Sequence, residues 1–370
     1  MVDAARGVIP RHTARPGSIP PIRPARGASL RPPGLLAAAL LLALLAPLQA
    51  VGAQHPAPGF SIGLPIACTP GYDCFIQNYV DRDPGPGARD YDCGRRTNNG
   101  HKGTDFRVPD LMAMRRGVAV LAVAPGRVLR TRDGVPDINV RYVGPAAVAG
   151  RECGNGVVVA HRDGWQTQYC HMRRGSIAVA PGETVEAGQK LGLVGLSGKT
   201  EFPHVHLSVR RRGRVVDPFV GPSPSPGCGV PRAPLWRPDL AGPLSYRPTE
   251  LVRIGFAAEP PVRAAVLLGR HRARVLPADA PVLSFWVLAI GLQRGDRIVM
   301  RMTGPDGATL AESRTRPLPR AKAEGFTRVM KRRRAGPWPA GTYRGEYRIE
   351  RRGGGATRVV LETVREVLVR

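Results

Sequence analysis

The chain reads Gly100-His101-Lys102-Gly103-Thr104-Asp105 and, further on, Pro203-His204-Val205-His206-Leu207. On a β-strand, residues two positions apart project from the same face, about 6 to 7 Å from each other. His204 and His206 can therefore address one cavity, where one histidine binds a metal and the other stays free for catalysis. The alternative is a hydrogen-bonded structural pair, because His-x-His arises often by chance. Five of the eight histidines lie between positions 101 and 206, although clustering alone proves little.

The sequence between these motifs alternates short apolar runs with turn signals, as β-strands do. Pro-Gly and Asp-Gly pairs form turns because they fix or permit the backbone angles that a turn needs. The apolar runs that precede such pairs are 118–124, 157–160 and 177–180. In the next run, 185–196, three glycines indicate strands whose backbones approach closely. We expect a mostly β protein with an antiparallel sheet folded on itself.

A second region follows a stretch that lacks apolar periodicity. Residues 221–250 are rich in Pro and Gly and are expected to form a linker after a domain at 54–220. Residues 251–370 again hold strand-like runs, which favour a small β-sandwich. These runs are 262–268, 282–292, 298–302 and 358–369, with turns at Pro305-Asp306-Gly307 and Gly353-Gly354-Gly355.

The chain is strongly basic, with a formal net charge of +27 from 55 Lys and Arg against 28 Asp and Glu. Residues 251–370 contribute +14 of this charge, with 22 Arg, 2 Lys and 10 acidic residues. Such an excess attracts polyanions over a Debye length. We expect anionic envelope polymers as partners of this segment, and a merely solvated surface is the alternative. Nucleic acid is not expected, because no nucleic-acid-binding signature is present.

The N-terminus is typical of an export signal. An Arg- and Pro-rich segment at 1–33 precedes an apolar run at 35–48 and small residues at 50–53. The run holds 14 residues and includes Pro47, whereas a spanning helix needs roughly 20. A cleaved signal peptide at 1–53 is therefore favoured over an uncleaved membrane anchor. We expect the protein in the periplasm or cell envelope.

Six cysteines follow this segment, and an even number in an exported chain indicates disulfides. They are Cys68, Cys74, Cys93, Cys153, Cys170 and Cys228. Three bridges allow fifteen connectivities, of which we expect the pairs Cys153–Cys170 and Cys68–Cys74. Zinc binding by cysteine is the rival interpretation, but no Cys-x-x-Cys pair supports it.

Five stretches in order resemble the lysostaphin-type, or LytM-type, zinc endopeptidases of bacterial peptidoglycan. They are Asn99 to Phe106, Val120 to Val128, Gly156 to Met172, Val179 to Gly198, and Pro203 to His206. The resemblance covers roughly residues 90–220. It implies an antiparallel β-sheet groove with flanking loops and a zinc cofactor. It also implies hydrolysis of a peptide bond in peptidoglycan cross-links, with a zinc-bound water as nucleophile.

The resemblance further implies a role for each histidine. In the family, the His-x-x-x-Asp motif and the second His of His-x-His hold zinc, which maps onto His101, Asp105 and His206. The His that ends the Tyr-x-His segment and the first His of His-x-His are catalytic. These positions are His171 and His204 here. His161 is interpreted as structural.

Two features depart from the family pattern. The cysteines indicate additional crosslinks, and Lys199-Thr200-Glu201-Phe202 replaces smaller residues before the His-x-His motif. Glu201 is expected to cap a turn, and contact with a substrate amine is the alternative. Further on, Lys331-Arg332-Arg333-Arg334 is interpreted as a solvated loop rather than a polymer site. Trp338 is interpreted as a packed residue at a sandwich edge rather than a sugar platform.

The expected function is that of a zinc metalloendopeptidase acting on peptidoglycan peptides, since all five positions of the family site are present together. A non-catalytic regulator that activates a cell-wall amidase is the alternative. Family members of that kind typically lack some metal ligands, whereas His101, Asp105 and His206 are intact here. A polyanion-binding protein dominated by residues 251–370 is the third hypothesis.

Overall fold

The computed structural model describes residues 59–223 and 225–370. β-Strands dominate these residues, as expected, and the named strands pair antiparallel except for the two-residue strand β12, which pairs parallel with β18. The expected signal peptide at 1–53 lies outside the described residues. Within the part of the chain that is described, no helix has the length and apolar character needed to cross a membrane.

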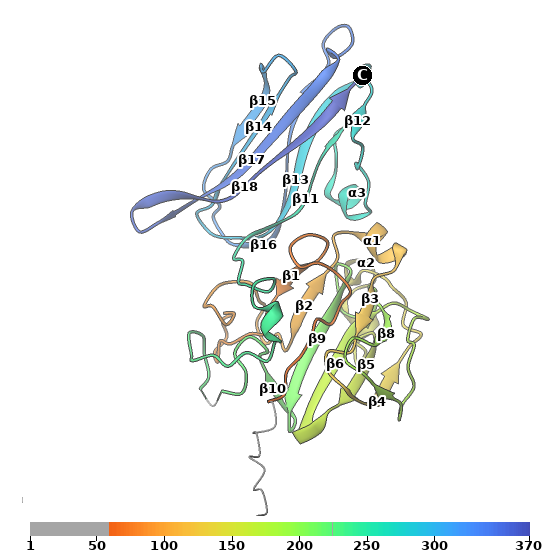
Figure 1. Cartoon of the computed structure of the whole chain (residues 1–370). Helices are drawn as coiled ribbons and strands as arrows, with labels where there is room; N and C mark the ends of the chain where they lie inside the picture. Colours follow the sequence, from red (N-terminus) through yellow and green to blue (C-terminus); the bar gives the residue numbers. More distant parts are fainter. Residues whose placement is uncertain (1–58, 224) are drawn as a thin grey trace, which may run out of the picture. The chain divides into compact units, whose positions relative to one another are not determined.

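The first sheet has eight strands and follows the order β1-β2-β9-β6-β5-β4-β7, with β10 paired to β9 (Figure 1). Along that order the strands are β1 Phe75–Asn78, β2 Thr104–Arg107, β9 His204–Arg211, β6 Trp165–Met172, β5 Asn155–Ala160, β4 Gly126–Arg132, β7 Thr184–Val185 and β10 Arg214–Val216. A separate pair joins β3 Ala119–Leu121 to β8 Lys190–Leu193. The predicted antiparallel sheet is confirmed, and β9 lies between β2 and β6.

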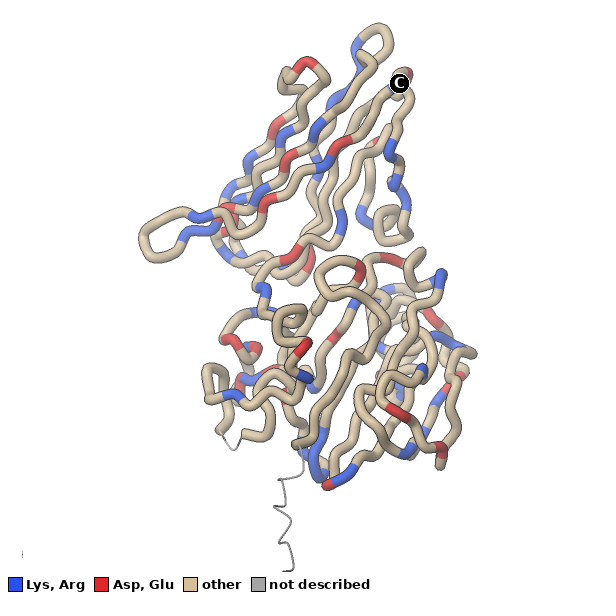
Figure 2. Tube along the Cα trace, in the orientation of Figure 1, with Lys and Arg blue, Asp and Glu red and all other residues tan. Residues whose placement is uncertain are grey.

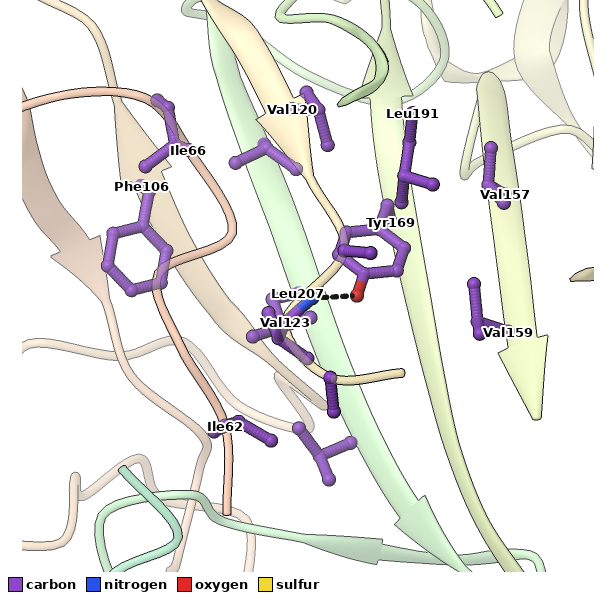
Figure 3. Packing of buried hydrophobic residues seen from close by; sticks show 14 of the residues in the cluster. Ile62, Ile66, Phe106, Val120, Val123, Val157, Val159, Tyr169, Leu191 and Leu207 are labelled. Carbon is purple, nitrogen blue, oxygen red and sulfur yellow. Dashed lines mark hydrogen bonds between the residues drawn. The ribbon is translucent and has the colours of Figure 1, made fainter. Parts of the chain in front are cut away.

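Alternation along β9 separates the core of this sheet from its open face. Val205, Leu207 and Val209 are each at most 1% exposed and belong to the first apolar core. Because side chains alternate along a strand, His204 and His206 project from the opposite face. In Figure 3, Tyr169 and Leu207 pack beneath the chain segments that carry Ile62, Val120 and Val123, and the Tyr169 hydroxyl accepts a hydrogen bond from Val123 N at 2.9 Å.

The short helices and the glycines lie between these strands. The helical segments between these strands are α1 Leu111–Arg116, α2 Val140–Val143, η1 Pro145–Val148 and η2 Arg162–Gly164.

The predicted close approach of backbones is confirmed at Gly195, where an added Cβ would lie 2.3 Å from Arg173 N. The predicted strand at 177–180 is wrong. Although Ala178 N donates to Leu191 O at 2.9 Å, the segment lies between two turns and forms no ladder among the described residues.

Residues 250–370 form two further sheets that enclose a second core, so the expected sandwich is confirmed. One sheet has the order β11-β13-β16 and the other β12-β18-β17-β14-β15. The strands are β11 Glu250–Ala257, β13 Val282–Leu292, β16 Lys322–Arg332, β12 Val275–Leu276, β18 Ala356–Val369, β17 Gly341–Gly353, β14 Arg297–Thr303 and β15 Thr309–Arg314. Phe285 of β13, Met300 of β14 and Tyr347 of β17 meet in the core.

The run at 262–268 is a helix, so its prediction as a strand is wrong. Residues Arg263–Leu267 form α3, and Val266 packs with Trp286 and Leu288 on the outer side of β13. A short apolar run does not distinguish a strand from a buried helix, and the alanines and leucines of this one favour a helix. The packed position of Trp338 is confirmed, because it is 8% exposed and its indole N–H donates to Ala280 O.

Residues 221–250, expected as a linker, pack against the first core. Trp236 and Leu240 are buried there, and η3 Pro238–Leu240 lies within the segment. Residues 57–370 form one compact unit. Buried ion pairs join the two sheet systems, with Arg96 bound to Glu250 at 3.1 Å and Arg107 bound to Glu324 at 2.9 Å.

All six cysteines form disulfides. The expected pairs Cys68–Cys74 and Cys153–Cys170 are confirmed, and the third bridge joins Cys93 to Cys228. This third bridge closes a sequence separation of 135 residues, and cross-links that close long loops restrict the unfolded chain most. It therefore fastens the segment at 221–250 to the loop that precedes the first histidine motif.

Candidate metal centre

The three residues expected to hold zinc come together at the edge where β2 meets β9. Asp105 on β2 is directly opposite His206 on β9, and His101 lies in the loop that leads into β2. Asp105 Oδ1 is 2.8 Å from His206 Nδ1 and 3.2 Å from His101 Nε2. The potential donor atoms of the three side chains lie within 4.8 Å of one another. Two nitrogens and a carboxylate form the donor set that catalytic zinc sites use.

Hydrogen bonds orient both of these histidines toward the carboxylate. His101 Nδ1 donates to the Tyr79 carbonyl at 2.7 Å, so Nε2 is the ring nitrogen that faces Asp105. The Ser208 hydroxyl donates to Lys102 O at 2.7 Å and therefore accepts from His206 Nε2, 3.1 Å away. Nδ1 is then the ring nitrogen of His206 that faces Asp105. Such partners behind metal-binding histidines fix the tautomer and the ring orientation.

A glycine in the first motif makes the close packing possible. A Cβ at Gly103 would lie 2.5 Å from His206 Nε2 and 2.5 Å from Leu207 O. Both separations are shorter than any real Cβ contact, and one of them involves backbone that cannot move aside. The motif needs glycine at this position because the backbone before β2 lies directly against His206 and Leu207 of β9.

The electrostatics of the cluster favour a cation. Asp105 is 3% exposed, and burial alone would raise its pKa, but the charges and hydrogen bonds of His101 and His204 hold that pKa well below its usual range. Burial would in turn lower the pKa of His101, and the charge and hydrogen bond of Asp105 outweigh this effect and raise it to about 9. A buried carboxylate that stays ionised requires positive charge next to it. A divalent cation would meet that requirement.

The two histidines expected to be catalytic lie beside the cluster. Their ring centroids are 4.6 Å apart, and His204 Nε2 is 3.4 Å from Asp105 Oδ1. His171 Nδ1 donates to Ser197 O at 2.8 Å and His204 Nδ1 donates to Phe202 O at 2.9 Å. In each ring the backbone carbonyl therefore holds the Nδ1 proton and leaves Nε2 available to another group.

His171 has an uncommon backbone conformation with φ of 61°. A non-glycine residue in this region costs free energy and is frequently found at functional sites. Its amide N–H donates to Cys153 O at 2.8 Å, next to the Cys153–Cys170 disulfide. Burial, followed by the charges of His204 and His206, lowers the pKa of the His171 ring well below its ordinary value. The ring is therefore neutral near pH 7 and able to accept a proton.

All five residues line one groove of about 1000 Å³. Its other walls carry more basic than acidic side chains, with Lys102, Lys199 and Arg210 against Glu152. Glu201 also lines it and forms an ion pair with Arg141 at 2.6 Å. The role of Glu201 as a turn cap stays a prediction. The Phe202 ring stacks on His204 with centroids 4.5 Å apart and holds that imidazole from the side.

His161 does not line the groove in the described part of the chain. Its ring nitrogens contact Pro125 O at 2.7 Å and Thr167 Oγ1 at 2.8 Å, and its ring packs on Phe60. Burial lowers its pKa. Both nitrogens are engaged by the fold, as expected for a structural histidine.

Two supporting residues were not identified from the sequence. Ser208 orients His206, and Asn78 Nδ2 donates to Asp105 Oδ2 at 2.8 Å. Ser208 follows His206 by two positions on the same strand, so period-two alternation could have placed it on the groove face. Asn78 gives no such signal, because its position depends on the pairing of β1 with β2.

Comparison with known proteins agrees with this architecture. Residues 99–218 match the sequence model of Peptidase family M23. Over 117 residues the chain is 33% identical to the peptidoglycan DD-endopeptidase ShyA and 32% identical to the peptidoglycan DD-endopeptidase ShyB, both of Vibrio cholerae. Each alignment covers 32% of this chain and 22% of the relative, so the chain spans about a fifth of the length of these relatives.

Among solved structures, a zinc-containing peptidase from Vibrio cholerae is 27% identical, with 38% of each chain covered and a TM-score of 0.25. The matched region 99–218 contains β2, β9 and all five histidine and aspartate positions of the groove. The chain thus contains a domain of Peptidase family M23, and this domain is the one that carries the candidate metal centre.

Proposed function

We propose that the protein is a zinc-dependent endopeptidase that hydrolyses peptide bonds in peptidoglycan cross-links. The observation that supports this most directly is the convergence of His101, Asp105 and His206 within 4.8 Å, in a domain of a peptidase family. The relatives ShyA and ShyB are peptidoglycan DD-endopeptidases, which supports this substrate class.

In this proposal His101 Nε2, the Asp105 carboxylate and His206 Nδ1 hold the zinc ion. The bound ion supplies a Lewis acid that polarises the scissile carbonyl and makes a water acidic enough to attack it near neutral pH. The residues of the chain orient the ligands through the Tyr79 carbonyl and Ser208. The donor set fits zinc because it leaves a coordination position free.

The two remaining histidines accept the proton of the attacking water and stabilise the negative charge that develops on the carbonyl oxygen. His171, neutral near pH 7, accepts the proton of the attacking water at Nε2. His204, whose ring centroid is 4.6 Å from that of His171, would stabilise the oxyanion through an Nε2–H. Both rings keep their orientation through the reaction because Ser197 O and Phe202 O hold their Nδ1 protons.

We also propose a domain organisation for the chain. Residues 54–220 are the peptidase domain, 221–250 pack on its core and lead to the rest, and 251–370 form a basic β domain. We further propose that the protein is exported to the periplasm or cell envelope. Three disulfides support this location, since structural disulfides persist in oxidising compartments.

The test is digestion of purified peptidoglycan by the zinc-loaded protein, followed by mass spectrometry of the muropeptides. We expect new amine termini at a cross-link and their loss in His101→Ala. A wild-type protein that binds one zinc per chain and yet releases no new amine would refute the endopeptidase. If His101→Ala stimulated a wall amidase as well as the wild type did, the groove would serve regulation instead.

A further inference from the structure

A second cavity, of about 700 Å³, shares no lining residue with the catalytic groove. Its wall comes from β11, β13 and β18 of the sandwich, from residues 271–274, and from residues 67–73 and 109–118 of the first half. Ligand sites commonly have volumes of several hundred cubic ångströms, so a small molecule fits here.

The cavity is lined by an unusual number of basic side chains, namely Arg116, Arg253, Arg272, Arg274, Arg365 and His271. Two of the arginines are paired, because Arg253 and Arg272 each contact Asp110 Oδ2 at 3.0 Å. Asp110 also caps helix α1 through Ala113 N, so these contacts belong to the fold. Burial lowers the pKa of Arg253, and the charges of Arg272 and Arg116 add to this effect.

The other three arginines have no acidic partner among the described residues. Several arginines elsewhere in the sandwich are paired, as Arg344 is with Glu346 at 3.0 Å and Arg348 with Glu350 at 3.1 Å, both within β17. Figure 2 shows basic and acidic residues along these strands. Asp73, the acidic residue on the cavity wall, accepts a hydrogen bond from Thr69 N. The cavity therefore concentrates positive charge that the protein does not neutralise.

Two buried nitrogens of the wall also lack partners in the described part of the chain. They are Trp286 Nε1 and His271 Nε2. Trp286 is 2% exposed, and a buried N–H without an acceptor is unfavourable. His271 in addition has a positive φ of 60°. Both nitrogens lie behind the surface of the wall.

The fold keeps the indole in this wall by means of a glycine. Gly255 pairs with Trp286 across β11 and β13, and a Cβ at position 255 would lie 2.7 Å from the Trp286 ring. Apolar surface from Val118 and Ile254 lies on the same wall, and the exposed Tyr72 ring stands beside it. The cavity thus combines cations with surface suited to the C–H faces of a ring.

We propose that this cavity binds an anionic sugar through a phosphate or carboxylate group held by arginines. A free inorganic ion would fill only a small part of the volume, whereas a sugar ring also uses the apolar wall. Guanidinium groups bind both kinds of anion with paired hydrogen bonds. The site lies outside the peptidase groove, so its ligand tethers or retains the enzyme and takes no part in hydrolysis.

The test is calorimetric titration of the full-length protein with glucose 1-phosphate, glucuronate and uncharged glucose. We expect saturable binding of one or both anionic sugars with one site per chain, and none of glucose. Binding of glucose 1-phosphate alone assigns a phosphate-bearing ligand, and binding of glucuronate alone assigns a carboxylate. No saturable binding of either anion at millimolar concentration overturns the proposal.

Variants separate the cavity from the general charge. Arg274→Gln and Arg365→Gln should each weaken binding about tenfold, the effect expected for a lost charge-assisted hydrogen bond. Arg358→Gln is the matched control, since it removes the same charge from an exposed position on β18 that does not line the cavity. Equal weakening by all three variants would show diffuse attraction and overturn the site. Cleavage of soluble muropeptides should be unchanged in Arg274→Gln, which keeps this test independent of the proposed peptidase activity.

Discussion

Asp105 and His206 face each other across the β2–β9 ladder, with Asp105 Oδ1 2.8 Å from His206 Nδ1. The register of one antiparallel pair thus brings together residues that are 101 positions apart in the sequence. A slip of one residue would turn His206 toward the apolar core and Leu207 toward the groove. The burial of Val205, Leu207 and Val209 opposes that slip, so the core fixes the geometry of the metal centre.

Removal of the Ser208 hydroxyl should weaken metal binding while the fold is retained. In Ser208→Ala, His206 Nε2 loses its acceptor and the ring loses its fixed tautomer. We expect the affinity for zinc to fall by about 10- to 100-fold, as for other partners of metal-binding histidines. Competition with a chromogenic chelator measures this change. Ser208→Thr keeps the hydroxyl and should retain most of the affinity; unchanged affinity in Ser208→Ala would contradict the assigned tautomer.

A methyl group at position 103 should damage the site more than its size suggests. In Gly103→Ala the new Cβ would overlap the His206 ring and Leu207 O, so β2 and β9 must shift apart. We expect a loss of bound zinc, measured by elemental analysis, together with a lower melting temperature. Gly242→Ala is the control, because nothing lies within 4 Å of an added Cβ there. Equal zinc content in both variants would show that the strands accommodate the methyl group.

The sequence predicted the elements whose evidence is local. Period-two alternation gave the shared face of His204 and His206, and the apolar run 282–292 corresponds to β13. Prediction from the sequence failed for segments whose structure depends on contacts with residues far away in the chain. The runs 262–268 and 177–180 are apolar enough for strands, but one covers the outer side of β13 as a helix and the other finds no ladder. Strand formation depends on a neighbour that the local sequence does not reveal.

Long-range pairing also explains which site residues were found. His101 and Asp105 share one motif, and the roles of all five residues came from the family resemblance. The contact of Asn78 with Asp105 depends on the pairing of β1 with β2, which the sequence does not reveal. The segment 221–250 reads as a linker because it lacks periodicity. Its isolated Trp236 and Leu240 nonetheless fill the first core, and irregular segments bury such residues without any repeating pattern.

Replacement of either candidate catalytic histidine should separate metal binding from hydrolysis. His171→Gln and His204→Gln leave the three proposed ligand residues in place, so we expect unchanged zinc content. We expect peptidoglycan cleavage to fall by about 100- to 10,000-fold, the contribution typical of a general acid–base group. Loss of zinc in these variants would instead identify the histidines as ligands.

The pH profile of cleavage offers a separate check on His171. Its pKa lies well below 6.5 because the ring is buried and lies near His204 and His206. The neutral, proton-accepting form therefore persists as the pH falls through 6.5. We expect the acid limb of kcat/KM to lie below pH 6.5, measured with a soluble muropeptide. If the midpoint of the acid limb lay at or above pH 6.5, the ordinary pKa of histidine, the buried His171 ring could not be the base.

The disulfide beside the groove should affect activity as well as stability. Cys153 O accepts the His171 amide, and Cys170 is paired with His206 across β6 and β9. We expect Cys153→Ser/Cys170→Ser to lose about 3 kcal/mol of unfolding free energy, as for other loops of similar length, and to lower kcat. Cys68→Ser/Cys74→Ser is the matched control, since that bridge does not line the groove. Equal effects on kcat would show that the crosslink acts only on global stability.

Asp217 should make the stability of the protein fall as the pH rises through neutrality. The side chain is 1% exposed, its Oδ1 accepts from Phe219 N at 2.9 Å, and its Oδ2 has no partner among the described residues. Burial, the largest effect, raises its pKa to about 7. The folded state therefore keeps a proton that the unfolded chain, with a pKa of about 3.9, releases. The stability from that proton is fully present below about pH 3.9 and is lost as the pH rises through about 7.

Asp217→Asn removes this titration, because an amide stays neutral at every pH. A shift of about three pKa units corresponds to about 4 kcal/mol, so the variant should gain up to that amount relative to the wild type between about pH 4 and about pH 8. Urea unfolding across this range measures the difference. Asp239→Asn, at an exposed position paired with Arg237, should show no comparable pH dependence. A constant difference between Asp217→Asn and the wild type at every pH would mean that Asp217 is ionised in the folded protein, with the buried carboxylate stabilised by groups other than a proton.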